Sequence, residues 1–522
     1  MLNIENFRLN KNKKNSFDNI KELKNFIENF FLQKNFKKFL SETSRILDLD
    51  ENVVVLKSKK LLSQKFIFKS NCFEQSFNFL KIVNQLLIFL MIYIKILFGK
   101  KKEKISKKDL VIFNIDKVDD IEKFKKILSS FNSSVIISKN KIDFNNISDH
   151  IQDTYLKKNL ILNYKNNYLD LRYRDKDEKY FIRTNIIHEK AIKLDINCIQ
   201  NKLQVFKFAL SLFFKSIKLK FNLLQLFNII LYSKIKNYSI FKTFKAKYLL
   251  QDRINYTCSI RNSLFKKMGG LVQGCIQTHL AEASISLFND IDVFFTFGDE
   301  QNSKNILTSL GSRVEKSLPA GSLRLENYFN NSSKEFNYDK EIDILVFGVN
   351  LYNWLYVNND SKINYYKFLD YIRTLADNYK DLRIAIKHHP YYINDDREIE
   401  IMKGSKVIYL DKKINSYSLI KNSKLFFSYS STMIVETNSI FGKSYFLDPN
   451  NCNNVMFGKN HHLNKIKLVD FFEIKNVIDT FILNKDNQKK AYTDICLDSK
   501  NVSELIVNNL KFYERNIKHS EF

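Results

Sequence analysis

The sequence predicts an α/β protein with two doubly wound, Rossmann-like domains, preceded by extra N-terminal helices. Short apolar runs that end at Gly, Asp or His alternate with stretches of helical spacing, as expected for the strands and helices of parallel sheets. The 522 residues also exceed what a single hydrophobic core supports. Ten of the eleven glycines lie between Gly269 and Gly458, and the three prolines are Pro319, Pro390 and Pro449. Because these residue types mark unusual backbone conformations, we expect the functional site in the second half of the chain.

The composition is typical of a cytoplasmic protein and gives little information about partners. The net charge is +28, but lysines are spread along the whole chain. We therefore treat the charge as a compositional bias and predict no nucleic-acid partner. The six cysteines include no CxxC pair, which argues for a reducing compartment and against a zinc site or a disulfide framework. The N-terminus shows no signal-peptide h-region.

Residues 1–105 are predicted to form a helical lead-in. Apolar residues recur at helical spacing between Phe17 and Phe30. The short runs Val53–Leu56 and Phe66–Phe68 are interpreted as β-like.

The lead-in ends in an apolar segment, Phe79–Phe98, followed by a lysine-rich cluster. Its charge-free part, Ile82–Ile94, would form about 20 Å of helix, less than the ~30 Å hydrocarbon core of a bilayer. Three alternatives stay open: a buried helix, a helix in the membrane interface, and a span in which Lys81 and Lys95 snorkel. The lysines favour an anionic leaflet, so peripheral association with the cytoplasmic face of the inner membrane is one of these alternatives.

The first domain is predicted over residues 106–330, where strand and helix patterns alternate. Its expected strands are Leu110–Asn114, Ser134–Ser138, Ala246–Asp252, Leu271–Gln277 and Asp292–Gly298. Its expected helices are Asp119–Ser129, Arg253–Met268 and Asp299–Leu310, with further helical spacing over residues 186–237.

A polar, turn-rich run at residues 329–340 marks the domain boundary. The second domain is predicted over residues 331–522, with strands at Ile342–Val349, Leu382–Lys387, Val407–Leu410, Leu425–Ser428 and Ser444–Leu447. Its expected helices are Tyr365–Tyr379, Ser416–Lys424, Met433–Phe441, 467–482 and 502–515. Ligands of such sheets bind beyond the carboxyl ends of the strands, so two such domains predict a cleft between them.

One strand end in the second domain carries basic groups that can hold a phosphate. Lys387 and His389 follow the expected strand, and Pro390 biases His389 toward an extended conformation. A Lys or His here can bind a phosphate oxygen through a charge-assisted hydrogen bond. The alternative is a surface histidine pair that caps the strand.

The next strand end is rich in hydroxyl groups. Ser430, Ser431 and Thr432 precede an expected helix, whose free backbone N–H groups would form an anion site with them. An ordinary N-cap is the alternative. Glu436 lies one turn into this helix, where its carboxylate can accept from a ribose hydroxyl or favour the helix dipole.

The candidate catalytic groups follow strands of the first domain. His279 and Glu282 come after one expected strand, and Asp299 comes after the next. Such a side chain can act as the general base that takes a proton from an acceptor hydroxyl, and a structural role is the alternative. Arg324, which follows a tight turn, is a candidate anion contact.

Several signature motifs are absent from the sequence. There is no GxxxxGK[ST], GxGxxG, HExxH or GxSxG run. Their absence argues against P-loop hydrolysis, dinucleotide-dependent dehydrogenation, and zinc or serine hydrolysis. No metal site is predicted.

The order of the motifs resembles that of the GT-B glycosyltransferases of bacterial surface-carbohydrate synthesis. Residues 245–450 contain, in order, R-N-S-L-F-K-K-M-G-G-L-V-Q-G-C-I-Q-T-H, D-V-F-F-T-F-G-D-E, L-P-A-G-S-L-R, I-L-V-F-G, I-K-H-H-P and S-Y-S-S-T-M-I-V-E-T-N-S-I-F-G-K-S. The group includes capsule and lipopolysaccharide transferases, sialyl- and Kdo-type transferases, and CDP-glycerol glycerophosphotransferases.

This resemblance implies a GT-B-like fold, with the donor in the second domain and the acceptor in the first. His389 and Pro390 correspond to the HP motif that contacts the donor's nucleotide phosphate. The serine motif that binds the same phosphate corresponds to Ser430, Ser431 and Thr432, and the acidic residue that often follows it corresponds to Glu436. No metal or cofactor is implied, because a helix dipole and basic side chains can offset the charge of the leaving phosphate.

We therefore expect a glycosyltransferase that moves a sugar from a CMP- or UDP-sugar donor to a surface glycan or lipid-linked acceptor. A polyol-phosphate transferase of the CDP-glycerol type is the alternative among enzymes. A basic, non-catalytic binding protein is the alternative from another class, although the sequence shows no basic face interleaved with aromatic residues.

Overall fold

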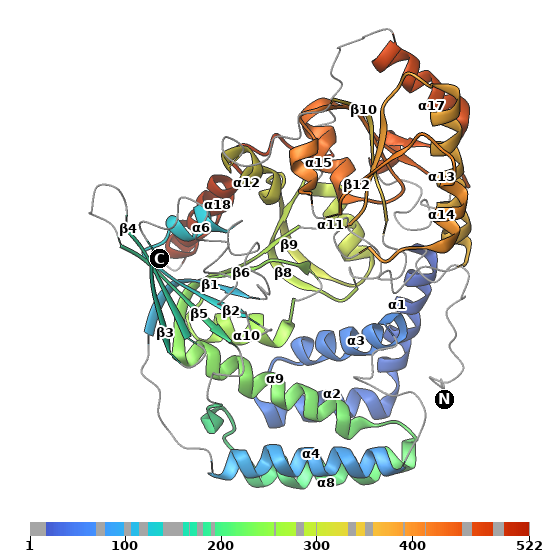
Figure 1. The fold of residues 1–522 in the computed structure, drawn as a ribbon. Coiled ribbons are helices and arrows are strands. Elements are labelled where there is room, and N and C mark those ends of the chain that lie inside the picture. The colour runs from blue at the N-terminus through green and yellow to red at the C-terminus, as the bar shows by residue number, and fades with distance from the viewer. Residues whose placement is uncertain are drawn as a thin grey trace.

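The computed structural model describes most of the chain. The described residues are 17–68, 79–98, 106–113, 124–138, 160–165, 168–174, 181–188, 194–254, 257–277, 287–298, 300–331, 341–349, 359–389, 392–412, 414–450, 462–483 and 495–520. They form two α/β domains, one above the other in Figure 1, with a layer of helices below the first domain.

Nine strands form the first sheet, in the spatial order β3-β4-β5-β2-β1-β6-β7-β8-β9. They span Ser106–Phe113 (β1), Ser133–Ser138 (β2), Leu160–Lys165 (β3), Tyr168–Arg174 (β4), Phe181–His188 (β5), Phe244–Gln251 (β6), Val272–Ile276 (β7), Asp290–Thr296 (β8) and Arg313–Pro319 (β9). The β3–β4 and β4–β5 pairs are antiparallel, and the other neighbours are parallel. The chain passes from β1 to β2, continues at the outer strand β3 and returns through β4 to β5, which pairs with β2. It then resumes on the other side of β1 with β6, which is doubly wound topology.

Both faces of the sheet are buried at the strands β1, β2 and β6. Val111 and Phe113 of β1 enter one hydrophobic core, whereas Leu110 and Ile112 enter another. A parallel strand covered on both faces reads as a continuous apolar run, which explains why five of the strands could be predicted. The helices of this domain are Lys125–Ser129 (α6), Ile196–Cys198 (η5, a 3-10 turn), Lys202–Leu219 (α8), Leu223–Thr243 (α9), Ser259–Lys267 (α10), Glu300–Ser309 (α11) and Leu323–Asn331 (α12).

Four helices precede the first sheet: Phe17–Leu32 (α1), Lys34–Leu47 (α2), Glu51–Phe68 (α3) and Phe79–Phe98 (α4). They share one core with α8, α9, α10 and a face of the sheet. The β-like interpretation of Val53–Leu56 and Phe66–Phe68 is wrong, because both runs lie inside α3. Val53 and Val54 are buried there, so tertiary packing overrides the β preference of a valine run.

The second sheet has six parallel strands in the order β12-β11-β10-β13-β14-β15. They span Ile342–Phe347 (β10), Ile384–Lys387 (β11), Ile408–Leu410 (β12), Ser423–Ser428 (β13), Ser444–Leu447 (β14) and Lys467–Leu468 (β15). Separate hydrophobic cores cover its two faces. The predicted fold class, two doubly wound α/β domains with extra N-terminal helices, is therefore confirmed.

The helical elements of the second domain are Asn359–Asn378 (α13), Asp396–Met402 (α14), Ser416–Leu419 (η8), Thr432–Phe441 (α15), His462–Ile466 (η9), Phe471–Ile478 (α17) and Asp479–Leu483 (η10, a π-helical turn). The helix expected over Ser416–Lys424 is shorter than predicted. A 3-10 turn ends at Leu419, and β13 begins at Ser423.

The last helix, α18 (Val502–Ser520), returns to the first domain. Val502, Ile506 and Leu510 join the core that contains β1, β6 and β7. The segment before it bridges the domains. Ile495 and Cys496 pack in a core of the second domain. Leu497 N–H donates to the Phe297 carbonyl of the first domain at 2.9 Å, and Ser499 Oγ accepts from Ser322 N–H at 2.9 Å. The predicted second domain, 331–522, thus needs a correction at its end, because the apolar face of α18 is buried on the first sheet.

Candidate functional site

In the second sheet, the direction in which successive strands are added reverses between β10 and β13. Its chain order runs outward from β10 through β11 to β12, and β13 then starts on the opposite side of β10. The helices α13 and α14 cover one face and α15 covers the other, and sheets of this kind bind their ligands at such a point. The residues that follow these strands are Gly348 after β10, His388 and His389 after β11, and Tyr429–Ser431 after β13.

The turn after β13 is fixed to the end of β10 by a serine. Ser428 Oγ donates to the Phe347 carbonyl at 2.7 Å and accepts from Ser431 N–H at 3.1 Å. Ser431 is the N-cap of α15, and its Oγ accepts from Met433 N–H at 3.3 Å. The ordinary capping function is therefore met by Ser431 alone.

Ser430 takes no part in these hydrogen bonds. Its hydroxyl is buried and has no hydrogen-bond partner among the described residues. A buried hydroxyl without a partner is costly, and this one precedes α15, whose N-terminal end carries partial positive charge. An anion bound at this end of the sheet would accept from Ser430 and be stabilised by the helix dipole. Thr432 begins the helix and is half-buried.

Lys387 is buried at the end of β11, with only 1% of its surface exposed. Its Nζ donates to the carbonyls of His388, at 2.5 Å, and Lys412, at 2.9 Å. Burial lowers the pKa of Lys387. In this structure the ammonium group ties the end of β11 to the loop after β12, and its predicted contact with a donor phosphate stays a prediction.

The two histidines that follow β11 have opposite environments. His388 is 4% exposed, and its ring stacks on Tyr392 with 3.7 Å between ring centroids and a 5° interplanar angle. Its Nε2 lies 2.8 Å from Oε1 of Glu398. His389 is exposed, and Pro390 lies outside the described residues.

Glu398 of α14 is buried and is the centre of a polar cluster. Its carboxylate accepts from the hydroxyls of Tyr365 at 3.2 Å, Tyr392 at 2.9 Å and Tyr409 at 3.1 Å. Burial and then the negative charge of Glu398 raise the pKa values of all three tyrosines. We call His388, Glu398 and these tyrosines the histidine–tyrosine cluster. Sequence reasoning missed it, because its members come from α13, β12, α14 and the loop before α14.

Gly348 allows the ring of His388 to lie against the end of β10. A Cβ atom at position 348 would be 2.2 Å from Nδ1 of His388. We expect Gly348→Ala to lower the free energy of unfolding by about 1–3 kcal/mol, since the ring or the backbone must move. Urea unfolding would measure this loss.

A double-mutant cycle provides the control for this prediction. Removing the ring with His388→Ala should make a later Gly348→Ala substitution nearly neutral, so that the two losses are not additive. Additive losses would contradict a steric contact between these two residues.

Glu436 and Arg324, which were predicted separately, lie together at the domain junction. Glu436 is 2% exposed and accepts from the hydroxyls of Ser322 and Tyr417, the latter at 3.0 and 3.1 Å. Burial raises its pKa, while the hydrogen bond from Ser322 and the charge of Arg324 oppose this shift. The carboxylate thus links α15 to the turn before α12, and contact with a ribose stays a prediction.

The candidate bases cannot be placed in this site. His279, Glu282 and Asp299 all lie outside the described residues. Among the residues that are described, no group of three or more His, Cys, Asp or Glu side chains could hold a metal ion.

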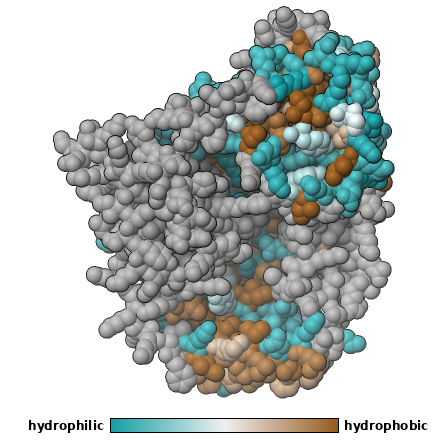
Figure 2. Space-filling model, in the orientation of Figure 1, coloured by the Kyte–Doolittle hydropathy of each residue, from teal (hydrophilic) through white to brown (hydrophobic). Residues whose placement is uncertain are grey.

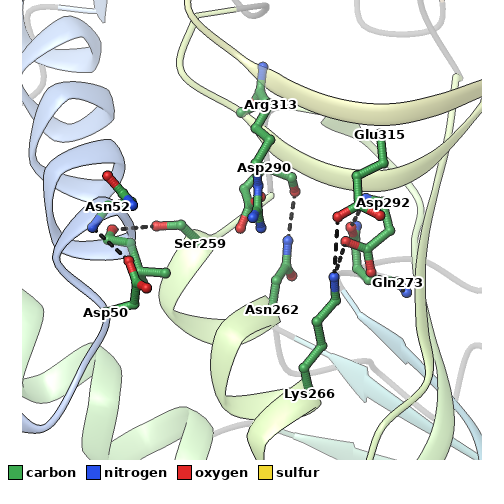
Figure 3. Close-up of polar contacts among 12 residues, drawn as sticks. Asp50, Asn52, Ser259, Asn262, Lys266, Gln273, Asp290, Asp292, Arg313 and Glu315 are labelled. Carbon is green, nitrogen blue, oxygen red and sulfur yellow. Dashed lines mark hydrogen bonds and ion pairs between the residues drawn. The ribbon is translucent and has the colours of Figure 1, made fainter. Parts of the chain in front are cut away.

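A second polar cluster lies in the first sheet, at the amino ends of its strands rather than at their carboxyl ends (Figure 3). Asp290 binds Arg313 with an N–O distance of 2.6 Å, and Asp292 binds Lys266 at 2.6 Å and accepts from Gln273 N–H at 3.1 Å. Burial raises the pKa values of both carboxyl groups, and the paired cations oppose the shift. Because these residues lie at the amino ends of β7, β8 and β9, we assign them a structural role.

The two doubly wound domains define an α/β protein with a GT-B-like fold. No family model matches the chain, and no curated protein matches it. Among solved structures, it is similar to the UDP-GlcNAc 2-epimerase from Neisseria meningitidis bound to UDP-GlcNAc, at 12% identity and a TM-score of 0.42, over 78% of this chain and 99% of that one. It is also similar to the S. aureus MnaA–UDP co-structure, at 13% identity and a TM-score of 0.44, over 79% and 97%.

A third similar structure is that of the wall teichoic acid polymerase TagF, at 11% identity and a TM-score of 0.40, over 83% of this chain and 99% of that one. At this level the similarities carry no argument about activity. The fold class rests on the strand orders and core packing of the chain itself.

Proposed function

We propose that the protein is a metal-independent glycosyltransferase that transfers a sugar from a CMP- or UDP-sugar donor to a surface glycan or lipid-linked acceptor. The observation that carries the proposal is the buried hydroxyl of Ser430, which has no partner among the described residues and lies next to the N-terminus of α15, after the end of β13, which pairs with β10. A nucleotide phosphate satisfies that hydroxyl and offsets the partial charge of the helix end. The motif resemblance over residues 245–450 supports the same assignment.

The proposed transfer requires groups that stabilise the charge on the leaving phosphate and accept a proton from the acceptor. The bond between the anomeric carbon and the phosphate oxygen breaks, and a bond to the acceptor oxygen forms. The leaving phosphate gains negative charge, which α15, Ser430 and the exposed imidazole of His389 stabilise. The acceptor proton goes to a base of the first domain, for which His279, Glu282 and Asp299 are the candidates.

A thermal-shift screen against CMP, CDP, UDP and GDP tests the nucleotide site. We expect a pyrimidine nucleotide to raise the melting temperature of the wild-type protein, as mass action requires for a ligand of the native state. His389→Ala and Ser430→Ala should each weaken binding by about tenfold or more, the effect of losing one charge-assisted hydrogen bond. Thr374→Ala, at an exposed hydroxyl of α13, is the matched control and should bind as the wild type does.

A wild-type protein that no nucleotide stabilises would contradict the proposal.

If a nucleotide does bind, transfer assays distinguish the two classes of enzyme. Turnover of CDP-glycerol with no turnover of nucleotide sugars would identify a polyol-phosphate transferase instead.

A further inference from the structure

Helix α4 has two opposite apolar faces in different environments. Ile82, Phe89 and Ile96 are at most 2% exposed, whereas Leu80, Leu87 and Ile94 are 74%, 54% and 54% exposed. Each set repeats every seven residues, and the two sets are offset by two positions, which is about 200° around a helix. One face is therefore part of the core, and the opposite face is apolar and open.

The buried face fixes α4 along the helical layer of the first domain. The Phe89 ring lies 6.2 Å from that of Phe206 on α8 and 6.5 Å from that of Phe227 on α9. Asn228 Nδ2 donates to the Gln85 carbonyl at 2.9 Å. By length and composition alone α4 could cross a membrane, but crossing would remove these contacts. The packing instead indicates a helix that lies flat.

Helix α8 extends the open apolar face. Leu203 is 59% exposed and Phe214 is 66% exposed, and they lie eleven residues, or about three turns, apart on one side of the helix. The two helices run side by side at the bottom of Figure 1, and Figure 2 shows apolar residues gathered along the same edge. We call the following set the α4–α8 face: Leu80, Leu87, Met91, Ile94, Leu203 and Phe214.

The charges on these helices all have one sign. Neither α4 nor α8 contains an Asp or Glu, and their lysines are Lys81, Lys95, Lys202, Lys207, Lys215 and Lys218. Lys95, Lys207 and Lys218 are exposed. An apolar surface with lysines only complements an anionic lipid surface, where the side chains enter the acyl boundary and the ammonium groups meet phosphates.

We propose that the α4–α8 face docks the protein onto an anionic bilayer, with both helices parallel to the membrane plane. The inference goes beyond the proposed reaction and rests on different residues. The face belongs to the first domain, whereas the described nucleotide-site residues belong to the second.

Vesicle co-sedimentation of the full-length protein tests this inference. Vesicles of phosphatidylcholine with phosphatidylglycerol should bind the protein, and vesicles of phosphatidylcholine alone should bind it more weakly. The double variant Leu87→Glu with Met91→Glu should weaken binding by at least about tenfold, since two apolar side chains no longer enter the bilayer. Phe214→Glu, on the other helix, should weaken it in the same direction.

Phe472→Glu is the matched control, because Phe472 is 71% exposed but lies on α17 of the second domain. It should bind vesicles as the wild type does, and all variants should keep the wild-type melting temperature. Four results would overturn the inference: a wild type that binds neither vesicle, variants on the face that bind as the wild type does, a vesicle-free dimer that Leu87→Glu dissociates, and protein that only detergent, not alkaline carbonate, extracts from membranes.

Discussion

Glu398→Ala should lower the free energy of unfolding by about 3–5 kcal/mol, which is the usual cost of removing one member of a buried charged network. Three tyrosine hydroxyls donate to this carboxylate, and His388 Nε2 lies 2.8 Å from it. Tyr365 and His388 are buried, so the substitution leaves at least these two groups without their acceptor in the interior. Urea unfolding monitored by circular dichroism would measure the loss.

Glu400→Ala is the control for this prediction. Glu400 lies on the same helix, α14, but its side chain is exposed, so its loss should change stability by less than about 0.5 kcal/mol. Equal losses for the two variants would contradict the importance of the histidine–tyrosine cluster. Because this cluster holds His388 against Gly348, Glu398→Ala should also weaken nucleotide binding through the neighbouring His389.

Lys60→Met should remove a pH dependence of stability that the wild-type protein shows above neutral pH. Lys60 is buried, and its Nζ donates to Thr257 O at 2.8 Å, Thr257 Oγ1 at 2.8 Å and Asn289 Oδ1 at 2.6 Å. None of these acceptors is ionised. Burial lowers the pKa of Lys60 to about 7.

The direction of the effect follows from proton binding. Burial is the main cause of the lowered pKa of Lys60, and the positive charges of Lys57 and Arg261 act in the same direction. Between pH 7 and about 10 the unfolded chain binds a proton at Lys60 that the folded chain has released. The contribution of Lys60 to the free energy of unfolding should therefore rise with pH by up to about 1.4 kcal/mol per pH unit in this window, and this contribution should stay constant below pH 7.

Unfolding titrations at pH 7, 8 and 9 would measure this slope for the wild type and for Lys60→Met. Lys37→Met, at an exposed lysine of α2, serves as the control and should keep the wild-type slope. A slope that is the same in Lys60→Met and the wild type would show that another group titrates.

The strands were predictable from sequence where both faces are buried. Runs such as Ile344–Phe347 and Leu425–Phe427 are apolar throughout and are followed by Gly348 and Ser428, so length and pattern suffice. Strand β9 was missed because Arg313, Glu315 and Lys316 are exposed within it, and its sequence does not read as a buried strand. The valine run in α3 shows the opposite failure, in which local preference suggested a strand inside a packed helix.

The residue types of the candidate site were predictable from the sequence, but the residues that contact them were not. The sequence places Lys387, His388 and His389 at a strand end, but it does not show which histidine faces the core. That choice depends on Glu398 and on tyrosines from three further segments. Glu436 is similar, because Ser322, which donates to it, is 114 residues away in the sequence.

The return of α18 to the first sheet determines how the two domains can move and how they can be divided. The polypeptide passes between the domains twice, once between β9 and β10 and again between Cys496 and Val502. These two crossings, with the hydrogen bonds of Ser322 to Glu436 and Ser499, restrain the movement of one domain against the other. The first domain is therefore not a continuous stretch of chain, and a protein ended before Val502 would expose the apolar surface of the first sheet to water.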